Sequence, residues 1–314
     1  MHACRIMARM MSRTSCALLC SAVLLTATQF ARSQTTTAQP PAATPDAKTE
    51  TSPTAATGTP PKPATPPPSP ANTKFMSARA LYYTPTAQGL KSFKCTVDFD
   101  WKDFLSRYAN GAEIKDDNPY LQYLRTVRLT VTDDLNGDGA LEWTATGAPP
   151  AGKEDSATQM QHGMEQMMVG FFSSWNAYMN GTMVPIPDST TTITETTDGF
   201  RMHAASGSIE VTELFDKNLL LTEAHVVQPS NDVYAYPTYT DTPDGRVVSA
   251  VRTVFRQPPT APPAELTINV SYTPVEGFRL PSTLAYELKN VGSFEFKFTN
   301  CSVQTNKKAP DVTE

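Results

Sequence analysis

The sequence predicts an α+β fold, in which a large, curved, half-barrel-like antiparallel β-sheet is covered on its concave face by a few helices. Apolar and polar residues alternate along many segments between residues 93 and 303, which is the period of strands with one buried face. Short connections rich in Gly, Asn and Asp separate these segments and favour antiparallel pairing. One long segment has helical spacing of its apolar residues and is the available cover for the sheet.

Residues 1–33 have the three-part layout of a secretory signal peptide. A basic start containing Arg5, Arg9 and Arg13 precedes an apolar or small run at 16–27, and small residues at 31 and 33 suit signal peptidase. We therefore expect cleavage before Gln34 and export to a periplasmic or extracellular place in the cell envelope.

Two other readings of this leader are less favoured. The apolar run is shorter than the roughly 20 residues that cross a bilayer, which argues against a retained anchor, and we expect no transmembrane segment after cleavage. Lipidation of Cys20 would need a small residue before it, where the chain has Leu19.

Residues 34–71 predict a disordered linker. Eleven of them are Pro, most others are Thr, Ala or Ser, and none is aromatic, so this stretch has too little apolar surface to fold. Residues 72–306 fit a single folded domain, and residues 307–314 a flexible C-terminal tail.

Removal of the leader changes both the charge and the cysteine count. The remaining chain has 22 Lys and Arg against 31 Asp and Glu, a net charge of −9, which argues against a nucleic-acid partner. Only Cys95 and Cys301 remain, and an even pair in an oxidising compartment favours a disulfide. Two separately buried thiols are the alternative.

The first half of the domain predicts two short helices and three strands. A helix is expected over Thr73–Tyr83, then a strand over Phe93–Trp101 with Cys95 on its apolar face. A second short helix follows, capped by Asp100 or Asp103. A hairpin joins strands at 127–131 and 141–145 through Asn136-Gly137-Asp138-Gly139.

The long helix is expected from Ser156, which would form a capping box with Gln159, to Asn180. One broad face carries Met and aromatic residues; the candidate ligand-binding set is Met164, Met167, Met168, Phe171, Phe172 and Trp175. Such a face either packs against the sheet or lines a cavity for apolar ligands, and a lid helix can do both.

From residue 190 onward the chain predicts strands and tight turns. The alternating segments are 200–204, 209–211, 219–221, 247–255, 266–272, 284–288 and 294–298, with turns at Asp198-Gly199, Asp244-Gly245, Glu276-Gly277 and Asn290.

No catalytic motif or metal-ligand spacing is found, and no cofactor is expected. Residues 134–139 match half of an EF-hand loop, but the twelfth position is Ala145 instead of Glu, so a plain hairpin turn is favoured over a calcium site. The histidines left after export are interpreted as surface or strand residues. Glu210, Glu213 and Glu223 are interpreted as solvated side chains on polar strand faces.

The order of these parts resembles the periplasmic outer-membrane lipoprotein carriers (the LolA-like group) and related envelope lipid carriers. The matching phrases are Gly89-Leu90-Lys91-Ser92-Phe93, Asp198-Gly199-Phe200, Phe215-Asp216-Lys217-Asn218-Leu219 and Gly277-Phe278-Arg279-Leu280-Pro281-Ser282. The resemblance implies a half-barrel closed by helices, and a lipid cargo. The Pro-rich linker and the disulfide depart from it, and no cargo-binding residue carries over.

Three functions follow from these observations. The first is an exported non-catalytic domain that binds an apolar ligand, a lipid or a lipid-modified protein, between sheet and helices. The second is an envelope protein-interaction or structural domain with a filled core and no small-molecule ligand. The third is an unrecognised enzyme, with a hydrolase among the possibilities.

Overall fold

The computed structural model describes residues 73, 75, 77–109, 112–135, 139–179, 184, 191–289 and 292–306. The expected signal peptide, linker and C-terminal tail lie outside these residues, as do residues 136–138 at the centre of the hairpin turn and Asn290.

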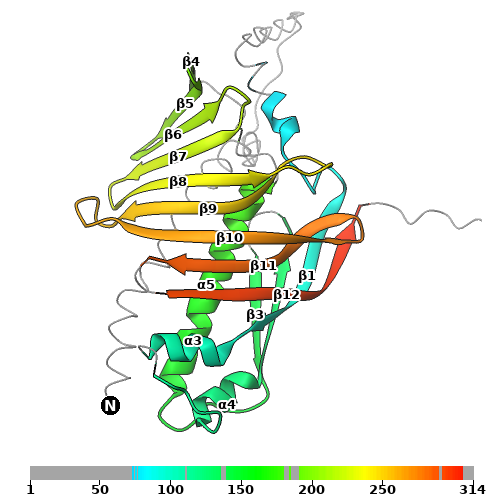
Figure 1. Cartoon of the computed structure of the whole chain (residues 1–314), viewed down its shortest axis with the longest axis vertical. Helices are drawn as coiled ribbons and strands as arrows, with labels where there is room; N and C mark the ends of the chain where they lie inside the picture. The colour runs from blue at the N-terminus through cyan, green and yellow to red at the C-terminus, as the bar shows by residue number, and fades with distance from the viewer. Residues whose placement is uncertain are drawn as a thin grey trace, which may run out of the picture.

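The described chain builds one antiparallel sheet of twelve strands, which confirms the predicted fold class (Figure 1). The strand order is β3-β2-β1-β12-β11-β10-β9-β8-β7-β6-β5-β4, and the sheet is not closed into a barrel. The strands are β1 (Leu90–Phe99), β2 (Val127–Asp133), β3 (Ala140–Ala145), β4 (Thr191–Thr196), β5 (Gly199–Ser206), β6 (Ile209–Asp216), β7 (Leu221–Gln228), β8 (Asn231–Thr240), β9 (Val247–Arg256), β10 (Ala264–Val275), β11 (Phe278–Leu288) and β12 (Gly292–Thr305).

The sheet curls around the long helix α5 (Glu154–Met179). This helix contacts both β3, at one end of the strand order, and β9, six positions further along. Strands so far apart reach one helix only if the sheet is strongly curved and the helix lies on the concave side (Figure 1). We call this concave side the inner face.

Among the described residues, α5 is accompanied by the short helical segments η1 (Ala78–Leu81), α3 (Trp101–Tyr108) and α4 (Pro119–Arg125). α3 and α4 lie at the end of the domain remote from β4 (Figure 1). The Asp100 side chain accepts from the Asp103 amide at 2.9 Å, so Asp100 is the cap and Asp103 is not. α4 was not predicted; Asn118 caps it and Pro119 occupies its first turn.

Several predicted boundaries are wrong. Trp101 belongs to α3 and not to the preceding strand. The long helix begins at Glu154, so Ser156 and Gln159 form no capping box; Glu154 and Asp155 instead place negative charge in the first turn. The first helical segment ends at Leu81, because Tyr82 is already extended and forms a bridge with Arg246.

The second half of the sheet also differs from the expected list of strands. Leu219 lies in a turn with a positive φ of 62°, so the expected strand at 219–221 begins only at Leu221. β4 and β8 were missed. β8 is an interior strand that contains Pro237, opposite Val251, with an irregular register directly after it, and a Pro argues against interior strands.

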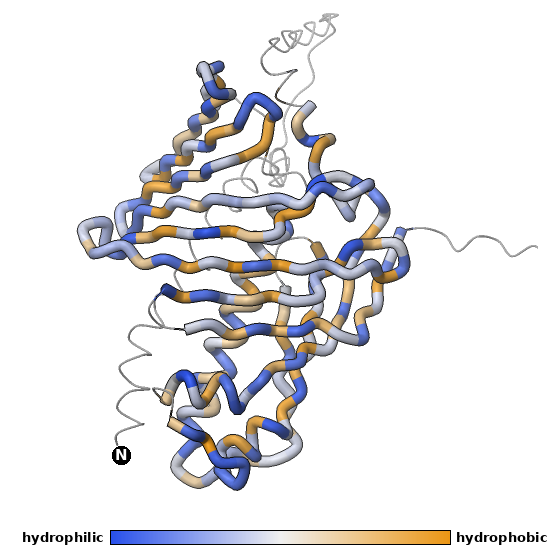
Figure 2. Tube along the Cα trace, in the orientation of Figure 1, coloured by the Kyte–Doolittle hydropathy of each residue, from blue (hydrophilic) through white to orange (hydrophobic). Residues whose placement is uncertain are grey.

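Hydrophobic residues alternate with polar ones along the strands (Figure 2), and the buried apolar residues lie on the inner face. Two clusters of buried residues result. The larger joins α5 to β1–β3 and β9–β12. The smaller joins the β5–β9 part of the inner face to η1, to Tyr178 at the end of α5 and to Val184.

Cys95 of β1 and Cys301 of β12 form a disulfide, which confirms the predicted pair. It lies at a β-bulge: Lys94 pairs with Ser302 and Thr96 with Thr299, so one residue of β1 faces two of β12. The disulfide therefore joins two neighbouring strands of the sheet through cysteines that are 206 positions apart in the sequence.

Candidate functional site

The six predicted ligand-binding residues of α5 come together on one side of the helix. Met164, Met168 and Phe172 are completely inaccessible, Trp175 is 2% exposed and Phe171 is 5% exposed. Met167 is partly buried at the margin of the same cluster.

The aromatic members of this set, Phe171, Phe172 and Trp175, pack against one another and against rings of the sheet. The Phe172 ring lies 5.6 Å from Phe93 and 6.0 Å from Phe298, and Phe93 also meets Trp175 edge to face at 5.9 Å. A Cβ at Gly139 would lie 2.6 Å from the Phe172 Cβ, so only a glycine lets the start of β3 approach α5 this closely.

Hydrogen bonds hold the helix in register with the sheet. Trp175 Nε1 donates to the Tyr272 hydroxyl at 3.1 Å, which donates to the Val248 carbonyl at 2.6 Å. At the other side, Asn176 Nδ2 donates to Asp133 Oδ1 at 2.9 Å, deep in the core. The α5 face is thus a packed support for the sheet. Two surface hollows, one lined by α3 and β10–β12 and the other by β1, α3, α4 and β12, include none of the six predicted α5 residues in their lining.

Apolar side chains on the inner face of strands β4 to β9 form a separate group, which we call the second cluster. This group does not include the six predicted residues of α5. Its strands contribute Phe200, Met202, Phe215, Leu221, Ala235, Val248 and Val251. Short pieces of chain cover it: Phe75, Ala78 and Tyr82 from the N-terminal segment, Tyr178 and Val184. Arg79 ties two of these pieces together, since its Nη1 donates to the Val184 carbonyl at 2.6 Å.

A carboxyl group lies on this apolar face. Glu213 of β6 is opposite Met202 of β5 and between Val211 and Phe215, which are both buried. The expectation that Glu213 is solvated is therefore wrong, whereas Glu210 on the opposite face is exposed as expected. Glu213 Oε2 is inaccessible and has no hydrogen-bond partner among the described residues. Burial raises the pKa of Glu213 to about 8 because the charged form is desolvated.

Three tyrosines, Tyr82, Tyr178 and Tyr239, lie close enough to Glu213 to interact with its charge. The Tyr82 hydroxyl accepts from the Leu221 amide at 3.0 Å and donates to the Leu219 carbonyl at 3.4 Å. The Tyr239 ring meets that of Tyr82 edge to face at 5.5 Å, and its buried hydroxyl makes no hydrogen bond of normal geometry within the described chain. Burial, and to a smaller extent the charge of Glu213, raise the pKa of Tyr178. We call Glu213, Tyr82, Tyr178 and Tyr239 the polar cluster.

The sequence contained a signal for this site that was not used. Val211, Glu213 and Phe215 occupy alternate positions of one strand, so an acidic residue sits in the apolar series. The strand period alone therefore places Glu213 on the buried face.

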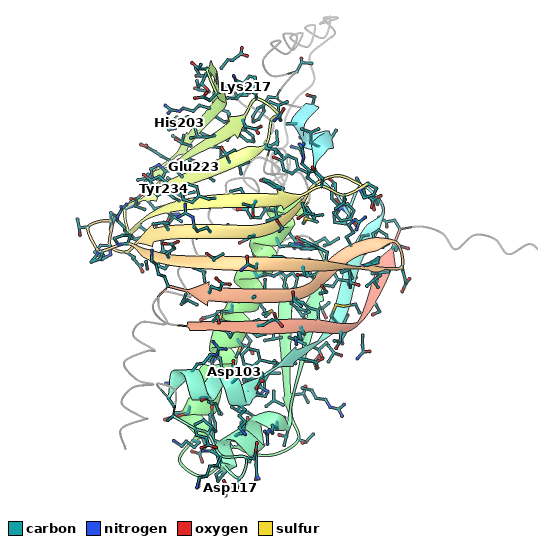
Figure 3. All side chains as sticks on the ribbon, viewed as in Figure 1. Asp103, Asp117, His203, Lys217, Glu223 and Tyr234 are labelled. Atoms are coloured by element: carbon teal, nitrogen blue, oxygen red, sulfur yellow. A yellow bond between two sulfur atoms is a disulfide. The ribbon has the colours of Figure 1, made fainter. Side chains whose placement is uncertain are left out.

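The outer face of the same strands carries satisfied polar groups. His203, Glu223 and Tyr234 project from β5, β7 and β8 (Figure 3). His225 stacks on Tyr234 at 3.9 Å and its Nε2 lies 2.7 Å from Asp232, which also binds Arg256 at 2.8 Å. Within the part of the chain that the structure describes, no three His, Cys, Asp or Glu side chains gather as a metal site would require.

Comparison with known proteins does not assign this chain: no protein-family model, no curated protein and no solved structure matches it. Among the helices of the described chain, none combines the length and apolar character needed to cross a membrane.

Proposed function

We propose that this is an exported, non-catalytic domain that binds an apolar ligand, a lipid or a lipid-modified protein, on the inner face of the open sheet. The ligand's apolar part lies along the second cluster and its polar end meets the polar cluster. The α5 residues that the sequence singled out belong to the larger cluster and lie outside this site.

The buried Glu213 carboxyl is the observation that carries the proposal. A carboxyl in an apolar setting without a partner costs several kcal/mol if it stays ionised, and it takes up a proton instead. A Leu or Met of similar size would fill the same place at no such cost. Ligand sites are mostly apolar, with a few polar groups that fix the orientation of the ligand. In such a site, the Glu213 carboxyl would bind the polar end of the ligand.

The protonation state indicates what the polar end of the ligand is. With its pKa near 8, Glu213 is mostly protonated at neutral pH, so it both donates and accepts hydrogen bonds. The Tyr239 hydroxyl adds a second group of the same kind. A neutral head with hydroxyl, ester or amide groups suits this pair better than an ammonium ion.

The composition of the cover bears on ligand entry. The cover over the second cluster consists of segments from distant parts of the chain, held by contacts such as Arg79 to Val184, Phe75 to Phe215 and Tyr82 to Leu221. Segments of this kind can open locally without unfolding of the whole domain.

Binding of a dansyl-labelled undecanoic acid and of its methyl ester tests the proposal directly. We expect uptake by the wild type, with enhanced dansyl fluorescence, and a tenfold or so weaker affinity for Glu213→Leu because the polar end loses its partner. Glu210→Leu on the exposed face of the same strand is the matched control and should bind like the wild type.

Two results would refute the proposal. If neither probe binds, the domain is better described as an envelope protein-interaction or structural domain with a filled core. If Glu213→Leu binds as tightly as the wild type, the carboxyl has no part in recognition. Native mass spectrometry of protein purified from its own host would identify any bound lipid.

A further inference from the structure

A buried hydroxyl on β9 resembles the Glu213 carboxyl in lacking a partner. Thr253 lies between Val251 and Phe255 in the buried series of β9 and is 1% exposed. Its Oγ1 makes no hydrogen bond to any described residue. A Val would fill the same place without burying a hydroxyl, and a buried hydroxyl without a partner lowers stability. Thr253 is therefore a second polar group on the inner face that a ligand could satisfy.

Thr253 and Glu213 belong to one row of residues that crosses the sheet. The strands β6, β7, β8 and β9 are neighbours in this order (Figure 1). Glu213 is opposite Ala224 of β7, which is opposite Ala235 of β8. Ala235 is in turn opposite Thr253. Residues directly opposite each other share a face of the sheet, and three strand spacings place the Cα atoms of Glu213 and Thr253 about 14 Å apart.

The part of the row between these two polar residues is shallow. Ala235 belongs to the second cluster and Ala224 packs against it, so two methyl groups form the floor. Larger apolar residues follow at both ends, with Met202 opposite Glu213 and Leu266 opposite Thr253. An extended acyl chain laid across the two alanines would reach from the carboxyl to the hydroxyl.

We propose that the ligand is an acyl ester or amide whose chain carries a hydroxyl group near its far end, and that this hydroxyl pairs with Thr253. This inference rests on the proposed function, since it takes the polar end of the ligand to meet Glu213. The chain crosses the floor of Ala224 and Ala235. Leu266, which is packed in the larger cluster, stops the chain just beyond Thr253.

The surroundings of Thr253 favour a hydroxyl over other chain ends. A threonine hydroxyl donates one hydrogen bond and accepts others, so it pairs well with a second hydroxyl. A plain alkyl end would leave Oγ1 unpaired. A carboxylate would bring a buried charge beside Ala235 and Leu266, the two residues opposite Thr253, and neither of them can balance it.

Three methyl esters of one chain length test the position of the hydroxyl, by competition with the dansyl-labelled methyl ester. Methyl 12-hydroxydodecanoate carries the hydroxyl at about the separation of Glu213 and Thr253, methyl 6-hydroxydodecanoate places it over the alanines, and methyl dodecanoate has none. We expect the 12-hydroxy ester to bind at least as tightly as methyl dodecanoate. The 6-hydroxy ester should bind about tenfold more weakly, because its hydroxyl is buried without a partner.

Substitution of Thr253 separates its hydroxyl from its shape. Thr253→Val should weaken the 12-hydroxy ester about fivefold or more, while methyl dodecanoate binds as tightly as to the wild type or more tightly. Thr253→Ser keeps the hydroxyl and should keep the preference for the 12-hydroxy ester. Thr238→Val on β8, at an exposed position, is the matched control and should bind all three esters like the wild type. Urea unfolding verifies that each variant folds.

The outcomes distinguish this inference from the proposed function. If methyl dodecanoate binds but the 12-hydroxy ester is weakened as much as the 6-hydroxy ester, the inference is overturned and the proposed function stands. The same holds if Thr253→Val keeps the wild-type ratio of affinities between the 12-hydroxy ester and methyl dodecanoate. If the wild type binds neither the dansyl probe nor any of the esters, both are overturned.

Discussion

Glu213 on β6 lies directly opposite Met202 on β5, on the buried face of the sheet. A strand places successive side chains on opposite faces, and the flanking Val211 and Phe215 are both buried. Glu213 is partly buried, and its Oε2 is inaccessible and has no hydrogen-bond partner among the described residues. An acidic residue in an apolar series conflicts with its position, and conflicts of this kind concentrate at functional sites.

The raised pKa of Glu213 predicts a pH-dependent stability. The folded-state pKa of about 8 lies above the ordinary value of 4.5, so the native state binds the proton more tightly than the unfolded state. The free energy of unfolding should fall as pH rises from about 4.5 to 8, by at most about 5 kcal/mol. Glu213→Gln should remove this loss and equal the wild type near pH 4.

Urea unfolding at pH 4, 6 and 8 measures this effect. Glu210→Gln, on the exposed side of the same strand, should follow the wild-type pH dependence. An unchanged slope in Glu213→Gln would show that the carboxyl is hydrated in solution.

Met168 offers a test of the packed state of α5. Because Met168 is fully buried in the larger cluster, Met168→Ala should lower the free energy of unfolding by about 2–5 kcal/mol through lost contacts and a cavity. Met167→Ala, at the partly buried margin, should cost clearly less. Equal and small effects of both changes would indicate that α5 lines an empty space.

Two glycines at the two ends of β5, Gly199 at its start and Gly207 directly after it, allow a paired test of backbone constraint. A Cβ at Gly199 would lie 1.9 Å from the Phe215 carbonyl oxygen, and this residue has a positive φ of 152°, so Gly199→Ala should destabilise the domain by about 3 kcal/mol or more. Gly207 also has a positive φ, 60°, but nothing lies within 4 Å of its Cβ position. Gly207→Ala should cost only about 1 kcal/mol. Thermal unfolding of both variants compares them, and equal costs would argue against the close approach at Gly199.

The Cys95–Cys301 disulfide predicts a large loss on removal. Replacing both cysteines by Ala should destabilise the domain by about 2–5 kcal/mol, because the crosslink closes a long loop in the unfolded chain. Alkylation of the purified, unreduced protein followed by mass spectrometry should label neither residue. A labelled thiol in the exported protein would contradict the disulfide.

The expected signal peptide and linker lead to a prediction about the form in which the chain is found after export. The intact mass should correspond to a start at Gln34, and limited proteolysis should cut within residues 34–71 while leaving the domain whole. A mass that retains residues 1–33 would instead favour a membrane anchor.

Local alternation was enough to predict the fold class and most strands. β1, β9, β10, β11 and β12 carry clear period-two patterns, since each has one face against the core. β8 was missed because Pro237 interrupts its pattern, and only neighbours on both sides hold it in the sheet. Trp101 continued the apolar series of β1, yet the Asp100 cap starts α3 at that point.

For the candidate site too, the local pattern predicted the residues of the helix face but not what packs against them. The Met and aromatic face of α5 was visible as a helical pattern, but whether it lines a space or fills one depends on what the sheet brings against it. Phe93 comes from β1, Phe298 from β12, and Gly139 lies directly before β3. No local pattern predicts their approach to Phe172.

By itself, the sequence determined the antiparallel α+β class, the pairing of Cys95 with Cys301 and the one long amphipathic helix, because these follow from periodicity and from residue chemistry. Only the tertiary structure decided that α5 contacts both β3 and β9, that its Met and aromatic face is packed, and that Glu213 lies partly buried near Tyr82, Tyr178 and Tyr239. These features depend on how far the sheet curls and on contacts between residues more than a hundred positions apart, such as Tyr82 and Leu221. Local residue preferences carry no information about such contacts.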